Sequence, residues 1–392
     1  MSTYRKLFRT VEFTPLFLVA SAQVMAQTVS GLALGTLVYS RTNSPLASAL
    51  ATFGLPLAQA LGATTVLTYA DKLPPRAAST STALILALGT AAQAIPGIPL
   101  WCIFVVLLVL GLTASLSGGV RYGLLNEILT TDRYLVGRSL FNISFGITQI
   151  FGFAVGGLMV ALLTTQGTLL VGASLYLASF VIAALCLHRR TARAEGRASI
   201  AENWKNNAIL LSAGRRRTLY LALWVPNGLI VGCESLFIAF TPRHAAVLFS
   251  CAAVGMLIGD IAVGRLLPPS WHQRLASSLR LLLAIPYLVF ILTPSLPVAA
   301  GTVLLASVGF SASLLLQQQL IAVVPHQLSG QALGLHSSGT LAMQGVGAAI
   351  AGTFAQFAGP SVAMATMATA SVVVTLALAP GLRTPKKSIL AT

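Results

Sequence analysis

The stretch PLWCIFVVLLVLGLTASLSGGV, residues 99–120, contains no charged side chain. A helix needs about 20 mostly apolar residues to cross the hydrocarbon layer of a membrane. The whole chain has the same character, because 56% of its 392 residues are hydrophobic and only 8% are charged. A soluble protein carries about 25% charged residues. The sequence therefore predicts an all-α membrane protein and excludes soluble enzymes, nucleic-acid-binding modules and secreted domains.

Twelve apolar stretches of this kind follow one another along the chain, and residues typical of turns separate them, such as Pro96-Gly97 and Gly359-Pro360. The third and ninth stretches are the shortest. The predicted transmembrane spans are residues 13–39, 45–70, 79–95, 99–120, 139–163, 168–188, 218–240, 244–264, 278–293, 297–318, 328–354 and 361–381.

The basic residues support this topology. When the loops are assigned alternately to two sides, all but two of the 24 Lys and Arg residues fall on the side that holds both termini. The exceptions are Arg41 and Arg243. Basic loops stay in the cytoplasm during membrane insertion, so both termini are predicted to be cytoplasmic. Membrane topology thus explains the net charge of +16, and no nucleic-acid partner is needed.

An internal repeat divides the chain into halves. At an offset of 193 residues, glycines of the second and fifth spans match glycines of the eighth and eleventh; the clearest pairs are Gly62 with Gly255 and Gly152 with Gly345. We therefore predict two pseudo-symmetric six-helix halves, residues 1–188 and 218–392. The polar linker, residues 189–217, contains a predicted surface helix over 199–211. Parallel repeats around an axis normal to the membrane are typical of secondary transporters.

Two motifs resemble those of the major facilitator superfamily, and the resemblance covers essentially the whole chain. The segment Asp71-Lys72-Leu73-Pro74-Pro75-Arg76 resembles the family's loop between spans two and three, with Leu67 in place of a glycine. In span five, Gly152-Phe153-Ala154-Val155-Gly156-Gly157 resembles the antiporter motif of drug exporters, with Phe153 in place of a proline. The overall resemblance is to bacterial drug and siderophore exporters, and it implies alternating access. Gly152, Gly156 and Gly157 are also predicted to allow close helix packing.

The loop motif implies a cytoplasmic gate. Asp71 is predicted to dock on the N-terminus of span eleven, where a helix favours negative charge. Its basic neighbours are expected to pair with Glu127 or Asp132, although solvated loop charges would serve the topology equally well. The predicted gate residues are Asp71, Lys72, Arg76, Arg121 and Arg265.

Glu234, in span seven, is the sharpest candidate for the substrate or proton pathway. A carboxylate inside the membrane costs about 2.5–3.5 kcal/mol, so it usually faces an internal cavity. Burial also disfavours the charged form, which suits a proton acceptor. Amide side chains near the membrane centre could contact substrate or bond neighbouring helices. The predicted pathway residues are Glu234, Asn227, Gln23, Gln27, Gln149 and Gln344.

These features predict a monomeric secondary transporter of a bacterial plasma (inner) membrane that exports a small amphipathic molecule by proton antiport. The substrate is predicted to be neutral or cationic, because the expected cavity contains one acid, several amides and aromatic residues, and no buried Lys or Arg. An uptake carrier or uniporter on the same fold is the alternative, and a polytopic membrane enzyme is a remote one. The four cysteines form no CxxC pair, and no HExxH or GxxxxGK[ST] motif occurs, so no metal, cofactor or nucleotide is expected.

Overall fold

The computed structural model describes residues 7–65, 73–191, 200–266, 272–325 and 328–382. These residues are nearly all helical and include no strand. The helices that start and end each half are α2 (Phe13–Thr42), α6 (Thr131–Cys186), α8 (Gly214–Ser235) and α15 (Pro360–Leu382). The helices between them are α3 (Pro45–Thr65), α4 (Pro75–Gln93), α5 (Leu100–Ile128), α7 (Ile200–Ser212), α9 (Phe237–Phe240), α10 (Ala245–Ile261), α11 (His272–Ala284), α12 (Leu296–Val308), α13 (Ala312–Val323) and α14 (Ser329–Ala358).

Ten of the described helices or helix combinations are long and apolar enough to cross a membrane. One of them, Ser144–Cys186, is 43 residues long and contains two spans, because Thr164 has non-helical backbone angles (φ 74°, ψ 168°). The chain turns there, and both Phe141 and Leu187 pack near Phe13. The 19-residue α4 is less apolar than these helices and lies where the sequence predicts the third span. The twelve predicted crossings are therefore all represented.

Short irregular segments interrupt three predicted spans. In span seven, helix α8 ends at Ser235, and the span continues as the short helix α9. Span nine combines α11 with a 3-10 helix, Ile285–Leu292. In span ten a 3-10 turn at Gly309 separates α12 from α13, and this glycine lies against the backbone of α11. Helix α7 occupies the linker, where the sequence predicts a surface helix.

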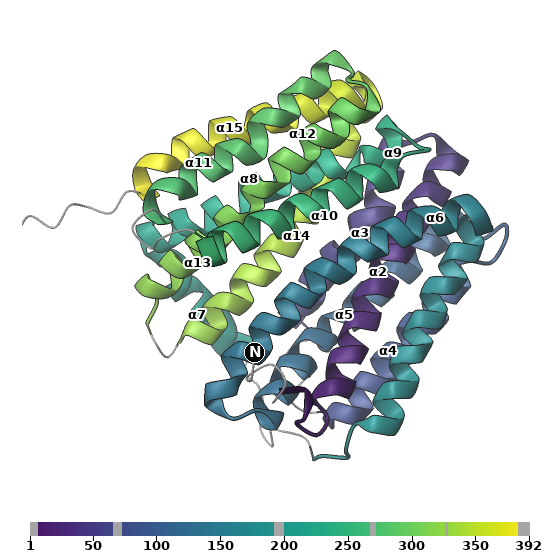
Figure 1. Cartoon of the computed structure of the whole chain (residues 1–392), viewed down its shortest axis with the longest axis vertical. Coiled ribbons are helices and arrows are strands. Elements are labelled where there is room, and N and C mark those ends of the chain that lie inside the picture. The colour runs from purple at the N-terminus through teal and green to yellow at the C-terminus, as the bar shows by residue number, and fades with distance from the viewer. Residues whose placement is uncertain (1–6, 66–72, 192–199, 267–271, 326–327, 383–392) are drawn as a thin grey trace, which may run out of the picture.

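The chain forms two six-helix halves (Figure 1), and equivalent helix pairs lie against one another in both. A Cβ added at Gly62 would lie 2.8 Å from the Ser115 Cβ, and one added at Gly255 would lie 2.8 Å from the Ser307 Cβ. These equivalent contacts join α3 to α5 and α10 to α12. The halves meet along two symmetry-related helix pairs, α3 with α14 and α6 with α10. Each half therefore contributes the same two surfaces to the interface.

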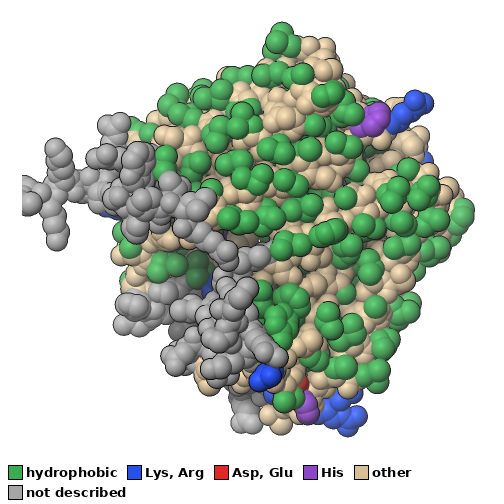
Figure 2. All heavy atoms as spheres, viewed as in Figure 1, with side chains coloured by type: hydrophobic (Ala, Val, Ile, Leu, Met, Phe, Trp, Pro, Cys, Tyr) green, Lys and Arg blue, Asp and Glu red, His purple; other side chains and the backbone are tan. Residues whose placement is uncertain are grey.

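The surface matches a membrane protein. Hydrophobic side chains cover the broad middle of the visible face, while Lys and Arg lie toward its ends (Figure 2). We call the end where α2 and α8 begin and α15 ends the terminal face, and the opposite end the far face. Arg41 and Arg243, the two cations that the sequence assigns to the minor side, flank far-face turns.

Candidate functional site

A cavity of about 480 Å³ lies on the terminal side of the interface between the halves. Helices α2 to α6 form most of its wall, and α14 of the other half forms the remaining side. The lining residues are Gln23, Val24, Gln27, Gln59, Ala63, Leu86, Ala114, Ser115, Ser117, Gly118, Gly119, Arg121, Tyr122, Arg138, Phe145, Tyr176, Leu333, Gly334, Ser337, Ser338 and Leu341. A space of this volume is in the range that holds a small organic molecule.

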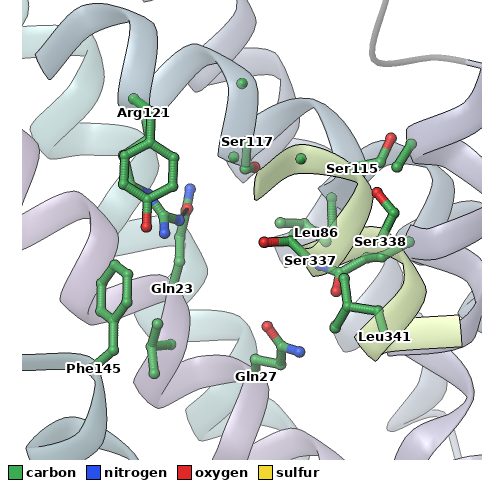
Figure 3. Close-up of a pocket in the computed structure, with 18 of the residues that line it drawn as sticks. Gln23, Gln27, Leu86, Ser115, Ser117, Arg121, Phe145, Ser337, Ser338 and Leu341 are labelled. Atoms are coloured by element: carbon green, nitrogen blue, oxygen red, sulfur yellow. Dashed lines mark hydrogen bonds between the residues drawn. The ribbon is translucent and has the colours of Figure 1, made fainter. Parts of the chain in front are cut away.

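Arg121 and Gln23 form one wall of the cavity (Figure 3). The Arg121 Nη2 donates a hydrogen bond to the Gln23 Oε1 at 3.3 Å, and the guanidinium lies over the Phe145 ring, 4.9 Å from its centroid. Gln23 itself is buried. The amide oxygen and the ring face both attract a cation, and together they fix the guanidinium beside the open space.

A second arginine lines the same cavity from α6. The Arg138 guanidinium lies over the Tyr122 ring, 5.3 Å from its centroid. The opposite wall comes from α14, with Ser337, Ser338 and Leu341 (Figure 3). The site is therefore cationic and aromatic on one wall, and hydroxyl-bearing and aliphatic on the other.

The two arginines correct the expectation that the cavity holds no Lys or Arg. The sequence places the end of span four at residue 120 and the start of span five at residue 139, so both arginines fall outside the predicted spans. The structure extends α5 to Ile128 and begins α6 at Thr131. Arg121 and Arg138 are thus each about two helical turns inside their helices. Arg121, predicted as a gate residue, is a cavity residue.

Glu234 does not line the cavity. It lies in α8, is only 6% exposed, and follows Cys233 in the hydrophobic core of the C-terminal half. Its Oε1 has no hydrogen-bond partner among the described residues. The structure therefore places this carboxyl inside one half, beside packed apolar side chains.

The predicted amides divide into two groups. Gln23 and Gln27 line the cavity. Gln344 donates from its Nε2 to the Asn227 Oδ1 at 3.4 Å, which joins α14 to α8 inside the C-terminal half. Gln149 is half-buried in α6 and lies outside the lining set. Of the predicted amides, only Gln23 and Gln27 of α2 therefore line the cavity, together with Gln59 of α3, which the sequence reasoning did not single out.

The predicted gate is only partly covered by the structure. Asp71 and Lys72 lie outside the described residues, and so does the side chain of Arg265. The Arg76 Nη2 donates to the Ala184 carbonyl near the end of α6, so this arginine joins α4 to α6. Glu127 forms an ion pair with Arg190, whose Nε lies 3.5 Å from the Glu127 Oε2, and its predicted partner Lys72 lies outside the described residues.

Sequence reasoning missed a charged cluster at the terminal face. The Glu12 carboxylate is buried and accepts hydrogen bonds from the Arg190 side chain and the His188 backbone N–H; the His188 Nδ1 lies 2.9 Å from the Glu12 Oε1. Burial raises the pKa of Glu12, but these hydrogen bonds outweigh it and hold the pKa below its usual value. The partners are far apart in sequence, and no local spacing could have paired them.

The glycines of span five allow three close approaches. Gly152 lies against Thr28 and Gly156 against Val29, both on α2, while Gly157 faces Ala246 of α10. Phe153, which replaces the proline of the exporter motif, stacks on Phe249 of the other half with ring centroids 4.7 Å apart. This stretch of α6 thus packs within its own half and across the interface.

Comparisons with known proteins agree with this architecture. Residues 16–324 match the family model of the Major Facilitator Superfamily, whereas curated protein sequences gave no match. A POT family transporter in complex with 5-aminolevulinic acid has a TM-score of 0.75 at 11% identity, covering 95% of this chain and 96% of that chain. The nucleoside transporter NupG has a TM-score of 0.72 at 14% identity, covering 95% and 100%. The human organic anion transporter MFSD10 has a TM-score of 0.69 at 17% identity, covering 96% and 99%.

These neighbours show the fold, and the family model matches most of the chain. With its two six-helix halves and the cavity between them, the chain is a membrane transporter, not an enzyme, and it belongs to the Major Facilitator Superfamily.

Proposed function

We propose that this chain exports a small amphipathic molecule by alternating access and exchanges it for protons. The observation that carries the proposal is the asymmetry of the interface. At the far face the halves are in contact, with the Ser44 Oγ donating to the Gln356 Oε1 at 2.9 Å and Leu46 packed against Gly352. On the terminal side residues of the same two helices, α3 and α14, line the cavity. A transporter that rocks about its centre would pass through such a state.

The basic residues orient this state in the membrane. The positive-inside rule places the terminal face in the cytoplasm, and a bacterial inner membrane is the setting that the sequence favours. The cavity then faces the cell interior, where an exporter collects its substrate. One chain supplies both halves, so a monomer is sufficient. An uptake carrier or uniporter would use the same state to release substrate.

Glu234 is the proposed proton site. Buried carboxyls in membrane helices commonly mark ion or proton pathways, and this carboxyl has an oxygen without a partner among the described residues. It lies outside the cavity, so it would act on the packing of α8 within the C-terminal half. Protonation and deprotonation would therefore bias the equilibrium between the two access states.

Alternating access can be tested without a known substrate. In a background lacking Cys102, Cys186, Cys233 and Cys251, one variant carries Ser337→Cys in the cavity and another carries Ala49→Cys at the buried far-face contact. Each is treated with a membrane-impermeant maleimide from either side of oriented vesicles. We expect Ser337→Cys to react from the terminal side and Ala49→Cys to react slowly from the far side. Cross-linking Ser44→Cys to Gln356→Cys should stop only the far-side reaction.

The role of Glu234 is tested by the pH dependence of the same two labelling rates. We expect the ratio of the rates to change with pH in the parent and to become independent of pH in Glu234→Gln. Glu127→Gln, which alters a carboxyl at the terminal face, serves as the control. If Ala49→Cys never reacts, alternating access is contradicted; an unchanged pH profile in Glu234→Gln would remove this residue from coupling. Flux in proteoliposomes under an imposed pH gradient then separates export from uptake.

A further inference from the structure

The cavity has a strongly one-sided charge. Its lining includes the guanidinium groups of Arg121 and Arg138, and none of the described lining residues is acidic. None of the ion pairs among the described residues involves either arginine. A cavity prepared for a cation would present carboxylates, and two of the three aromatic lining residues, Phe145 and Tyr122, already hold an arginine over the ring. The electrostatics of the site therefore favour an anion.

Arg121 is the stronger of the two positions. Its described contacts are one long hydrogen bond to the Gln23 amide and the Phe145 ring, both neutral groups. A cation inside the membrane is costly when it lacks an opposite charge. The guanidinium has five N–H donors, so most remain for a ligand. A carboxylate can accept two of them in parallel, which an amide or an ammonium cannot do.

The rest of the cavity indicates the body of the ligand. Tyr176 and Leu86 line it near Gln27, and Leu341 lies on the opposite wall. Hydroxyls are available at Ser337 and Ser338, and the Ser117 Oγ is buried without a partner among the described residues. The anionic group would thus bind at Arg121, and an apolar body would extend toward α14.

We propose that the transported molecule is a small organic anion with a carboxylate-type head group and an apolar body, held by Arg121 and assisted by Arg138. This inference rests on the proposed function, and it replaces the neutral or cationic substrate predicted from the sequence. The charge comes from two residues that the sequence assigned to loops. The bidentate geometry of Arg121 selects the head group, and the ring of Tyr176 together with Leu86 and Leu341 selects the apolar body.

A matched set of probes tests the head group. Naphthalene-2-carboxylate, naphthalene-2-carboxamide and naphthalen-2-ylmethylammonium share one body and differ in charge. Thermal unfolding of the purified full chain is measured with each probe up to millimolar concentration. We expect the carboxylate alone to raise Tm, because a ligand that binds only the folded state stabilises it. High salt should reduce the shift.

Variants locate the binding site. Arg121→Gln should weaken carboxylate binding about tenfold or more, the loss expected for a charge-assisted hydrogen bond, and Arg121→Lys should retain part of it. Arg138→Gln should cause a smaller loss. Arg9→Gln removes the same charge from an exposed position on the terminal face and should bind like the parent. If Arg121→Gln does not fold, carboxylate binding is compared between Arg121→Lys and Arg9→Gln. Weaker binding in Arg121→Lys alone would still locate the site at Arg121.

Three outcomes would overturn the inference: an ammonium probe that stabilises as much as the carboxylate, a carboxylate response that survives Arg121→Gln, or no response to the carboxylate at all. Flux measurements in proteoliposomes separate this inference from the proposed function. Carboxylate that binds but never crosses the membrane would contradict transport and leave the anion site standing. Transport of the amide or ammonium probe, without the carboxylate, would contradict the anion site and leave transport standing.

Discussion

The two halves share one helix plan but use their interiors differently. The N-terminal half is the hollow one: its helices form most of the cavity wall, and 50% of the most apolar stretch of α2 and 28% of that of α5 are buried. The C-terminal half is packed more tightly: the equivalent stretches, in Gly214–Phe240 and Leu296–Val323, are 78% and 50% buried. At the repeat offset of 193, the fully buried Tyr220 corresponds to Gln27 of the cavity. A polar cavity residue of one half is thus replaced by a packing residue in the other.

This difference indicates that the two halves have different roles. The N-terminal half presents the ligand-binding wall, while the C-terminal half is a compact body that contributes α14 to the cavity. The C-terminal half also encloses Glu234, Arg280 and His336, all buried. Two arginines of the first half therefore line the cavity, whereas none of these three ionisable residues of the second half does.

The largest expected effect concerns the packing of the C-terminal half. A Cβ added at Gly347 would lie 1.9 Å from the backbone oxygen of Gly228, so α14 and α8 would have to separate. Overpacking typically costs about 1–3 kcal/mol, and a collision with backbone lies at the upper end, so we expect Gly347→Ala to lower the free energy of unfolding by about 3 kcal/mol. Thermal unfolding and the yield of folded protein measure this loss.

Gly118 provides the matched control in the N-terminal half. It lines the cavity, and no atom lies within 4 Å of an added Cβ. Gly118→Ala should change Tm little. Equal losses in the two variants would contradict the contrast between a hollow half and a packed one.

The fold could be predicted because membrane spans are long apolar runs that need no knowledge of tertiary contacts. The two arginines of the cavity could not be predicted, because the same reading of apolar runs excludes charged residues from the spans. Charged residues were used to end the spans, so Arg121 and Arg138 were assigned to loops although both lie within helices. Gln23 and Gln27 were found because an amide within an apolar run is visible locally. The ion pair of Glu12 with Arg190 depends on how α2 and the end of α6 meet, and neither segment carries that information alone.

The next effect concerns the terminal face of the N-terminal half. Because the pKa of Glu12 is lowered in the folded state, its ion pair and hydrogen bonds stabilise the protein above the unfolded pKa of about 4.5. This contribution is lost as the pH falls through the lower, folded-state pKa. We expect Glu12→Gln to cost about 2 kcal/mol at pH 7, the usual value for hydrogen bonds to a charged group. The Tm difference from the parent should shrink as the pH falls below 4.5.

Glu127→Gln tests whether burial causes the effect, since the Glu127 side chain is 32% exposed and shares Arg190 at 3.5 Å. Its cost at pH 7 should be smaller, because solvent screens a partly exposed pair. A Tm difference for Glu12→Gln that stays constant from pH 7 to well below 4.5 would mean that the side chain acts through packing and not through its charge.

The smallest effect compares two glutamines that the sequence ranked together. Gln344 bonds Asn227 within the C-terminal half, and interhelical hydrogen bonds in membranes contribute about 0.6 kcal/mol; Gln344→Leu should therefore lower stability by about that amount and leave carboxylate binding unchanged. Gln27 lines the cavity, so Gln27→Leu should keep its Tm without ligand and alter the shift produced by naphthalene-2-carboxylate. Thermal unfolding with and without the probe measures both quantities. If Gln344→Leu alters binding as strongly as Gln27→Leu, the assignment of Gln344 to helix packing alone is contradicted.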